Sequence, residues 1–412
     1  MTKRILTLEE AALLPRWRRP ESLLFLMAFA MPMAFATWSA LLNNFVIEMA
    51  GFTGVQIGWL HTVREIPGLL AVGVIALILV MREQVLAVGA LALLGLSTAV
   101  TAWFPSFGGL LAVTLLSSIG FHYFETVNQS LQLQWVDKAR APRVLGRIVA
   151  VGSGASLLSY GVIVALWTPL GLSYDTVYLV SGGLTAVIAM FCHLAYPQFD
   201  GPHRQNRQMV LRRRYWLYYA LQFMAGARRQ IFVVFAGFMM VERFGMKVSE
   251  MTALLLVNYV LQMVAAPAMG RALGRFGERR VMVFEYVGLT LVFLAYGGLY
   301  WFGWGLIIAS GLYILDQMFF ALSFALRTYF QKIADPADIA PTAAVAFTIN
   351  HIAAVFLPAG LGYLWATSPD YVFILGAGMA LVALGLALLI PRHPEPGYET
   401  IFGNIARRVA AE

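Results

Sequence analysis

Long apolar stretches, each of a length that can cross a lipid bilayer, constrain this chain more than any other feature of its sequence. A transmembrane helix needs about 20 mainly apolar residues, and the 412 residues accommodate twelve such segments joined by short connections. The expected spans lie at about 22–47, 53–81, 85–103, 107–135, 145–168, 174–197, 214–241, 249–273, 281–301, 303–331, 339–366 and 371–391. The predicted fold class is therefore an all-α polytopic membrane protein with 12 transmembrane helices and no separate soluble domain.

The composition excludes several classes of protein. Hydrophobic residues make up 60% of the chain and charged residues 12%, with a mean hydropathy of +0.74. Soluble domains carry about 25% charged residues, so a large soluble enzyme is excluded. No Walker loop, GxSxG elbow or HExxH pair occurs in a suitable context, which disfavours an ATP-driven pump or a membrane hydrolase. We expect no enzymatic activity and no cofactor, and the single cysteine, Cys192, is predicted to be a packing residue.

Basic residues collect in alternate connections between the expected spans. The exceptions are Arg243 and Lys247, which follow span seven. By the positive-inside rule, both termini and the loop at 198–214 are predicted to face the cytoplasm, in agreement with an even number of spans. Membrane orientation thus accounts for the net charge of +8, and no nucleic-acid partner is expected.

The two halves of the chain look like copies of each other. A shift of about 195 residues places Arg19 on Arg214, Gln132 on Arg327 and Trp135 on Phe330, and it keeps most span edges in step. We therefore predict an N-terminal six-helix bundle at 1–197, a linker at 198–214, and a C-terminal six-helix bundle with a short tail at 215–412. Such a duplication is typical of transporters whose substrate site lies between the repeats.

Two sequence motifs resemble those of the major facilitator superfamily. The stretch GRALGRFGERR after span eight is similar to the family's glycine-rich basic loop, although Gly274 stands where an acidic residue is usual. PRVLGR, from Pro142 to Arg147, is a second likeness. The resemblance implies two pseudo-symmetric bundles, alternating access, a monomer, and the cell inner membrane as location. It also implies a gating or structural role for the residues of the first motif, Gly270, Arg271, Gly274, Arg275, Arg279 and Arg280, with the two glycines in close helix packing.

Polar stripes on two spans are the next candidates for function, because ionisable side chains within a bilayer are costly and usually functional. Residues three, four or seven apart share a helix face. Span four carries such a stripe at His122, Glu125, Asn128 and Gln132, and span ten carries one at Asp316, Ser323 and Arg327. In the family fold both spans line the cavity. We predict that His122, Asn128, Gln132 and Arg327 bind substrate, and that Glu125 first and Asp316 second carry a coupled proton.

Arg228 and Arg229 lie near the middle of span seven. Adjacent residues on a helix diverge by about 100°, so we predict that one faces the cavity and the other faces partner helices. A planar guanidinium suits bidentate capture of a carboxylate or phosphate. The alternative is a structural salt bridge from one of these arginines to Glu125 or Asp316.

The remaining polar candidates lie on spans two, nine and eleven. Glu65 is a third candidate for proton coupling, and Arg64, which is expected to point away from it, is a gating or structural residue. The alternative is internal pairing of these groups. Asn350 and His351 on span eleven are candidate substrate ligands, although a lone intramembrane histidine is more often a packing residue. Glu285 is expected near the cytoplasmic end of span nine and is given no role.

These expectations combine into one predicted function, a secondary transporter that moves a small organic anion or zwitterion with a proton. No metal site is predicted, but an importer of copper or another metal remains an alternative. It would use His61, His122 and His351 with the methionines Met27, Met31 and Met33. A multidrug exporter that uses Glu125 or Asp316 is a second alternative. A non-transporting sensor or assembly factor on the same fold is a third.

Overall fold

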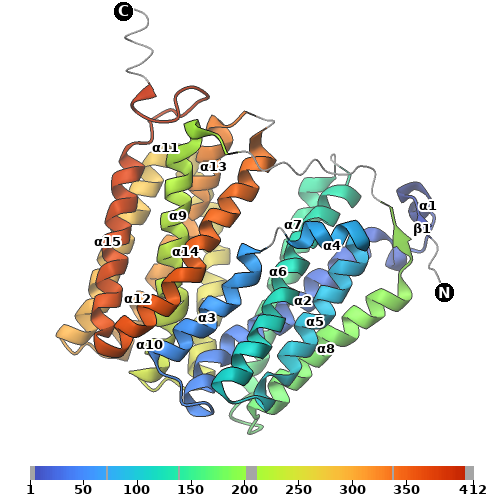
Figure 1. Cartoon of the computed structure of the whole chain (residues 1–412), viewed down its shortest axis with the longest axis horizontal. Helices are drawn as coiled ribbons and strands as arrows, with labels where there is room; N and C mark the ends of the chain where they lie inside the picture. Colours follow the sequence, from blue (N-terminus) through green and yellow to red (C-terminus); the bar gives the residue numbers. More distant parts are fainter. Residues whose placement is uncertain (1–4, 71–72, 138–139, 201–210, 336–337, 404–412) are drawn as a thin grey trace, which may run out of the picture. The chain divides into compact units, whose positions relative to one another are not determined.

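Helices account for almost all regular structure in this computed structural model, which describes residues 5–70, 73–137, 140–200, 211–335 and 338–403 (Figure 1). Within those residues, ten helices are long and apolar enough to cross a membrane. One of them, α11 (Val248–Trp301), contains two of the expected spans. The expected second span corresponds to α3 (Gly54–Leu69) and α4 (Gly73–Val80). Each of the twelve apolar stretches thus forms helix, and the predicted all-α polytopic class is confirmed.

The described chain divides into two compact units. Unit 1 falls within residues 1–52, 63–206 and 247–256 and holds most of the first half of the sequence. Unit 2 falls within residues 53–62, 207–246 and 257–412 and holds most of the second half. The first turns of α3 are therefore packed within unit 2, and the first turns of α11 within unit 1. The predicted linker at 198–214 lies mostly outside the described residues, and so does the last part of the predicted C-terminal tail, at 404–412.

Unit 1 contains the long helices of the first half. They are α2 (Pro20–Glu48), α5 (Glu83–Val100), α6 (Phe107–Trp135), α7 (Ala141–Leu166) and α8 (Tyr174–Ala195). Shorter elements are β1 (Ile5–Leu6), α1 (Leu8–Ala12), the 3₁₀ turns at Arg16–Arg18 and Thr101–Trp103, and β2 (Gln198–Phe199), which pairs with β1 in parallel. Serine N-caps begin two of the long helices: Ser106 accepts from the amide of Gly109, and Ser173 accepts from the amide of Thr176.

Glycines allow α5 to pack closely against α8, its neighbour in Figure 1. A Cβ atom at Gly95 would lie 2.6 Å from the amide nitrogen of Ala186, and one at Gly182 would lie 2.3 Å from that of Ala99. Both distances are shorter than any van der Waals contact, so only glycine fits where these backbones cross. Small residues have the same role in many membrane helix pairs.

Unit 2 contains the remaining helices. They are α9 (Trp216–Gln230), α10 (Gly237–Glu242), most of α11, α12 (Leu306–Phe320), α13 (Phe324–Ile333), α14 (Ile339–Thr367) and α15 (Pro369–Leu388). A 3₁₀ turn at Arg213–Tyr215 precedes α9, a π-helix at Ile231–Ala236 joins α9 to α10, and a 3₁₀ turn at Ala321–Ser323 joins α12 to α13. α9 packs against α14 and α15 (Figure 1).

The connection expected at 274–280, between spans eight and nine, is very short. Two helices meet here at Gly277, whose φ of 76° lies in the left-handed region that favours glycine. The sequence predicted a loop of several residues, and regular helix instead lies on both sides of this one residue. One non-helical residue is enough to redirect the chain, since the flanking turns satisfy their own backbone hydrogen bonds.

A network of polar side chains fixes the entry to α9 within unit 2. Arg212 pairs with Asp338 at 3.2 Å, and Arg214 pairs with Asp335 and with Asp338. The Tyr215 hydroxyl donates to Asp338 at 3.2 Å. The hydrogen bond from Arg212 is the main cause that holds the pKa of the Asp338 carboxyl below its ordinary value. The network ties residues before α9 to residues that begin α14.

Candidate functional site

A cavity of about 50 Å³ lies in unit 2 and is lined from α9, the π-helix and α12. The polar part of its wall consists of two arginine side chains of α9 and the side chains of an aspartate and a glutamine of α12, and the apolar part consists of phenylalanine and valine side chains. The lining residues are Arg228, Arg229, Phe232, Val233, Asp316, Gln317 and Phe320. This volume has room for water molecules but is too small for an organic molecule, so a substrate that bound here would require the surrounding helices to move.

Arg228 lines the cavity together with Arg229 and also pairs with a neighbouring helix, through a residue to which the sequence assigned no role. Its Nη2 atom lies 3.3 Å from Oε1 of Glu285 on α11. The two side chains are 3% and 1% exposed, so this is a deeply buried ion pair. The guanidinium also lies over the rings of Tyr286 and Phe320, at 5.7 Å from each centroid. These contacts hold Arg228 within the unit.

The carboxyl group of Asp316 is the second buried charge at the cavity. The residue is 3% exposed, and Arg228 is near enough for its charge to act on the carboxyl. Within the described chain, Oδ2 of Asp316 has no hydrogen-bond partner. Its neighbour Gln317 accepts a hydrogen bond of 3.2 Å from Gln262 on α11. An unsatisfied carboxyl oxygen at a cavity wall is a position where a ligand, a water or a proton is needed.

The backbone next to these arginines is irregular. The α-helical pattern of α9 ends at Gln230, and the following residues Ile231–Ala236 form a π-helix before α10 begins at Gly237. Such wide turns are rare and are frequently found at functional sites. Here the wide turn directly follows the pair that lines the cavity. Gly226, one turn before the arginines, lets α9 approach Asn350 of α14 so closely that a Cβ atom would lie 2.5 Å from its carbonyl oxygen.

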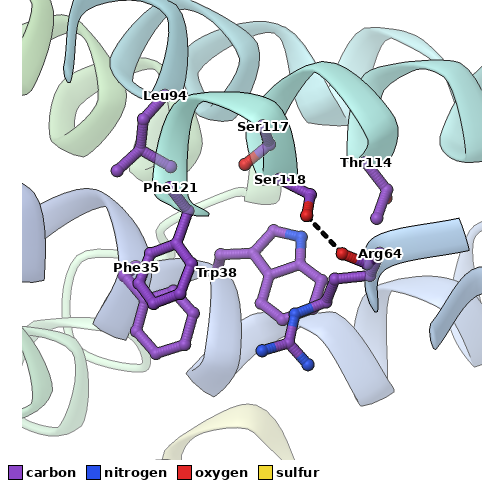
Figure 2. A pocket seen from close by; sticks show the side chains of 8 residues that line it. All are labelled: Phe35, Trp38, Arg64, Leu94, Thr114, Ser117, Ser118 and Phe121. Atoms are coloured by element: carbon purple, nitrogen blue, oxygen red, sulfur yellow. Dashed lines mark hydrogen bonds between the residues drawn. The ribbon is translucent and has the colours of Figure 1, made fainter. Parts of the chain in front are cut away.

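A second cavity, of about 10 Å³, lies in unit 1 beside Arg64 and has room for about one water (Figure 2). The Arg64 guanidinium lies over the ring of Trp38 at 5.1 Å and over that of Phe35 at 5.8 Å. Phe35 also stacks on Phe121, with 4.6 Å between the ring centroids. The Ser118 hydroxyl donates to the carbonyl of Arg64 (Figure 2). Aromatic faces thus hold this cation in place.

The expectation that Arg64 points away from Glu65 is wrong. Nη1 of Arg64 lies 3.3 Å from Oε1 of Glu65, and the two side chains are 14% and 3% exposed. Adjacent Cβ atoms do diverge on a helix, but the arginine side chain has enough rotatable bonds to curl back to its neighbour. Internal pairing of these two groups, which the sequence left as an alternative, is what the structure contains.

The span-four stripe on α6 combines one buried residue with three of intermediate exposure. His122 is buried, and its Nδ1 lies 3.0 Å from Oγ and 3.1 Å from the carbonyl oxygen of Ser118 on the same helix. Glu125, Asn128 and Gln132 are of intermediate exposure. Oδ1 of Asn128 has no hydrogen-bond partner among the described residues. The assignment of this stripe to substrate and proton binding stays a prediction.

Three candidates from spans ten and eleven, Arg327, Asn350 and His351, are not among the residues that line the cavity of unit 2. Arg327 on α13 is exposed. His351 is buried on α14, its Nδ1 is 2.9 Å from the carbonyl oxygen of Phe347, and its ring lies 4.1 Å from that of Phe347. Asn350 donates a 3.3 Å hydrogen bond to the carbonyl of Gln222 on α9. Their assignment as substrate ligands stays a prediction.

The glycines of the family-like motif do not pack closely. Against the described residues, a Cβ atom at Gly270 or Gly274 would meet nothing within 4 Å. Arg271, Arg275 and Arg280 are exposed and Arg279 is partly exposed, and all four lie on the helical turns on either side of the break at Gly277. The expectation of close packing was wrong because spacing alone does not show which face of a helix meets a neighbour.

Comparison with known proteins decides the family. The sequence profile of the Major Facilitator Superfamily matches residues 23–358. The chain belongs to this superfamily. A search of curated proteins found no match.

Solved structures with the same fold are transporters of this superfamily. A variant of the nucleoside transporter NupG superposes with a TM-score of 0.73 at 14% identity, over 90% of this chain and 99% of that one. The unaltered NupG gives 0.69 at 14% identity, over 89% and 98%. A bacterial homologue of the human lysosomal transporter Spinster, in an inward-facing and occupied conformation, gives 0.67 at 12% identity, over 90% and 95%. At these identities the likeness is one of fold.

Family membership makes this chain a multi-pass membrane transporter for a small molecule, and it confirms the resemblance and the absence of an enzymatic role. Sequence reasoning gave no role to Glu285, Gln317 and Phe320, which line the cavity of unit 2 or pair with its lining. A signal for Glu285 existed: it lies seven residues after Glu278, so both share a helix face, and Glu278 is itself buried and paired with Lys332.

Proposed function

We propose that this superfamily member is a secondary active transporter that carries a small organic anion or zwitterion by alternating access, coupled to protons. The observation that supports it is the cavity of unit 2, whose wall combines two guanidinium groups, one amide and one carboxyl group with aromatic faces. Arginine donors recognise carboxylate or phosphate, and the Asp316 carboxyl offers an acceptor for an ammonium group. Such a wall is complementary to both charges of a zwitterion.

Arg229 is the proposed ligand of the substrate anion. It lines the cavity and is more exposed than Arg228, whose guanidinium is held by Glu285. The other proposed ligands are His122, Asn128, Gln132, Arg327, Asn350 and His351. Glu125, Asp316 and Glu65 are the proposed proton carriers. A carboxyl group serves this purpose because burial favours its neutral form while a nearby arginine favours its charged form.

Arginine-to-lysine substitutions test the proposed ligand. Arg229→Lys keeps the charge but loses the forked geometry, so affinity should fall about ten- to a hundredfold, which corresponds to about 1.5–3 kcal/mol. Arg243→Lys is the matched control, because Arg243 of unit 2 is not among the residues that line the cavity and donates a 3.0 Å hydrogen bond to the carbonyl of Leu299. Binding is measured by thermal stabilisation of purified protein and exchange by counterflow in liposomes. Unchanged affinity in Arg229→Lys contradicts the assignment.

The substrate class is tested by the same stabilisation assay across chemical classes. Organic acids, amino acids, vitamins, metal ions and organic cations each supply one arm. Nucleosides are included because NupG, similar in fold, is a nucleoside transporter. Stabilisation by organic cations alone would favour the alternative of a multidrug exporter, for which the unsatisfied oxygen of Asp316 is the supporting observation. No stabilisation by any class would favour the sensor alternative.

We also propose the orientation and organisation predicted from the sequence. These are a monomer in the cell inner membrane, cytoplasmic termini, and bundles at 1–197 and 215–412 with a cytoplasmic linker at 198–214. The asymmetry of basic residues and the 195-residue duplication support them.

A further inference from the structure

The segment before α2 is fixed to the end of unit 1 at which α8 finishes. β1 pairs with β2, which follows α8 closely, and α1 lies beside them (Figure 1). The Tyr196 hydroxyl donates to the carbonyl of Trp17 at 2.6 Å, and the Ser22 hydroxyl donates to that of Arg16 at 2.6 Å. These hydrogen bonds hold the backbone at residues 16–18, so the side chains of this turn extend from a fixed support.

One face of α8 is an exposed apolar stripe. Its five residues are Val180, Leu184, Val187, Phe191 and Leu194, with exposed fractions from 40% to 68%. Residues three and four apart share a helix face, so the stripe runs along one side of α8 toward its C-terminal end. α8 is long and apolar enough to cross a membrane. In a multi-pass membrane protein, lipid acyl chains cover a face of this kind.

Aromatic rings continue this stripe beyond the end of α8. The ring of Phe191 lies edge-on to that of Tyr196, with 6.4 Å between the centroids, and Tyr196 lies edge-on to Trp17 at 6.5 Å. The Trp17 residue is 55% exposed. Tryptophan and tyrosine are enriched where the hydrocarbon of a bilayer meets the headgroups. We therefore place Trp17 at the level of the lipid headgroups.

Two arginines stand on either side of Trp17 in the sequence. The Arg18 guanidinium lies over the Trp17 ring at 5.6 Å from its centroid, and its Nε donates to the carbonyl of Ala195 at 3.0 Å. That hydrogen bond uses a single N–H of a guanidinium that carries several. Arg16 is exposed. Donors of both side chains are thus available to an anion at the end of the stripe.

The acidic side chains near this turn have other partners. Glu21 pairs with Arg140 at 3.0 Å, and Glu10 accepts a 2.9 Å hydrogen bond from the amide of Thr7 in the capping box of α1. Within the described part of the chain, neither arginine of the turn forms an ion pair with a carboxylate. The turn is therefore positively charged, and it directly adjoins a surface that lipid covers.

We propose that Arg16, Trp17 and Arg18 form a binding site for an anionic phospholipid, whose acyl chains lie along the exposed stripe of α8. The guanidinium groups bind the headgroup phosphate through charge-assisted hydrogen bonds. The lipid leaflet that faces the cytoplasm is negatively charged, and it is the leaflet at which the proposed orientation places this turn. The inference goes beyond the proposed function, since it requires neither a substrate nor a coupled proton.

Titration of the detergent-purified full chain with lipid tests this site. Native mass spectrometry counts the lipids that each protein molecule retains, and phosphatidylglycerol is compared with phosphatidylcholine of the same acyl chains. Wild type should retain a first phosphatidylglycerol more strongly than phosphatidylcholine. A basic residue near an anionic surface strengthens binding about fivefold. The double variant Arg16→Gln with Arg18→Gln should therefore bind this lipid about 20- to 30-fold more weakly and lose the preference.

Arg213→Gln with Arg392→Gln is the matched control, because it removes the same charge from two exposed arginines of unit 2. The control should keep the wild-type preference. A preference that survives in the double variant, or that the control loses to the same extent, overturns the proposal. If loss of the Arg18 contact with α8 prevents folding, Arg16→Gln is used alone. It should bind phosphatidylglycerol about fivefold more weakly, and an unchanged affinity overturns the proposal.

Inorganic phosphate separates a lipid site from a site for any anion. Added at the concentration of the lipid, it should not displace the retained phosphatidylglycerol, because it lacks the acyl chains that contact α8. Displacement at that concentration overturns the assignment to a lipid. A phosphatidylglycerol with a photoreactive acyl chain, added at one molecule per protein, should label α8 in wild type and label it less in the double variant. Equal labelling of α8 in both proteins contradicts the proposal.

Discussion

Replacing Thr62 by valine should weaken the packing of α3 against α14 within unit 2. The Thr62 hydroxyl donates to the carbonyl of Val355 at 2.8 Å and accepts from the amide of Ala359 at 3.1 Å. The hydroxyl thus lies between the carbonyl of Val355 and the amide of Ala359, which are four residues apart on α14. Pro358, which lacks an amide hydrogen, lies in the same turn. Valine keeps the shape of threonine and removes both hydrogen bonds.

The expected magnitude follows from those two bonds. Interhelical hydrogen bonds in membranes contribute about 0.6 kcal/mol on average, and those in soluble proteins about 0.5–1.5 kcal/mol. Thr62→Val should therefore lower the free energy of unfolding by about 1–3 kcal/mol. At about 2 °C per kcal/mol, the lower end for long chains, the melting temperature should fall by about 2–6 °C.

Thermal unfolding of detergent-purified protein, followed by tryptophan fluorescence, measures this change. Thr62→Ser is the matched control because it retains the hydroxyl and removes only a methyl group. The reasoning is refuted if Thr62→Val melts at the wild-type temperature, or if Thr62→Ser loses as much stability as Thr62→Val. The second result would assign the effect to methyl packing, which is tight here because a Cβ atom at Gly58 would lie 2.3 Å from the carbonyl oxygen of Pro358.

Three other predictions concern pH, orientation and coupling. The pKa of Asp338 is lowered in the folded protein, so its ionised form stabilises the fold above the ordinary carboxyl range, and this contribution is lost as pH falls through the lowered pKa. The difference in unfolding free energy between wild type and Asp338→Asn should therefore be largest near neutral pH and should shrink in acid. A difference that grows in acid would contradict this prediction. Single cysteines placed near either terminus or in the 198–214 loop, in a Cys192→Ser background, should resist an impermeant thiol reagent added to intact cells, whereas labelling from outside would reverse the predicted orientation. Glu125→Gln should abolish accumulation driven by a pH gradient in liposomes while exchange continues, and undiminished accumulation would remove Glu125 from the proton carriers.

The charged residues that line the cavity of unit 2 were largely predictable from the sequence, because a charge within an apolar span is unusual. Arg228, Arg229 and Asp316 were chosen on that ground, and all three line the cavity of unit 2. Glu285 was given no role because it was expected close to the cytoplasmic end of its span. In the structure it lies two turns after the break at Gly277 and is buried.

Pairing, in contrast, could not be predicted from spacing. The partner of Arg228 is 57 residues away in the sequence, and the expected partners were Glu125 and Asp316. Helical periodicity states which residues share a face, but the rotation of one helix against another is set by how all the side chains of the interface pack. The ion pair of Arg64 with Glu65 illustrates the same point, since a flexible side chain can reach a partner even where its Cβ atom points away from it.

The sequence by itself determined that this protein crosses a membrane many times. A twenty-residue apolar stretch within lipid has to satisfy its own backbone hydrogen bonds, and a helix does so. It also contained the motifs that indicated the family, which the family profile confirms. Only the tertiary structure decided which acid Arg228 binds, where α11 breaks, and which glycines allow close packing. These depend on distances between helices that are far apart in the chain, and such distances result from the simultaneous packing of many side chains rather than from any local pattern.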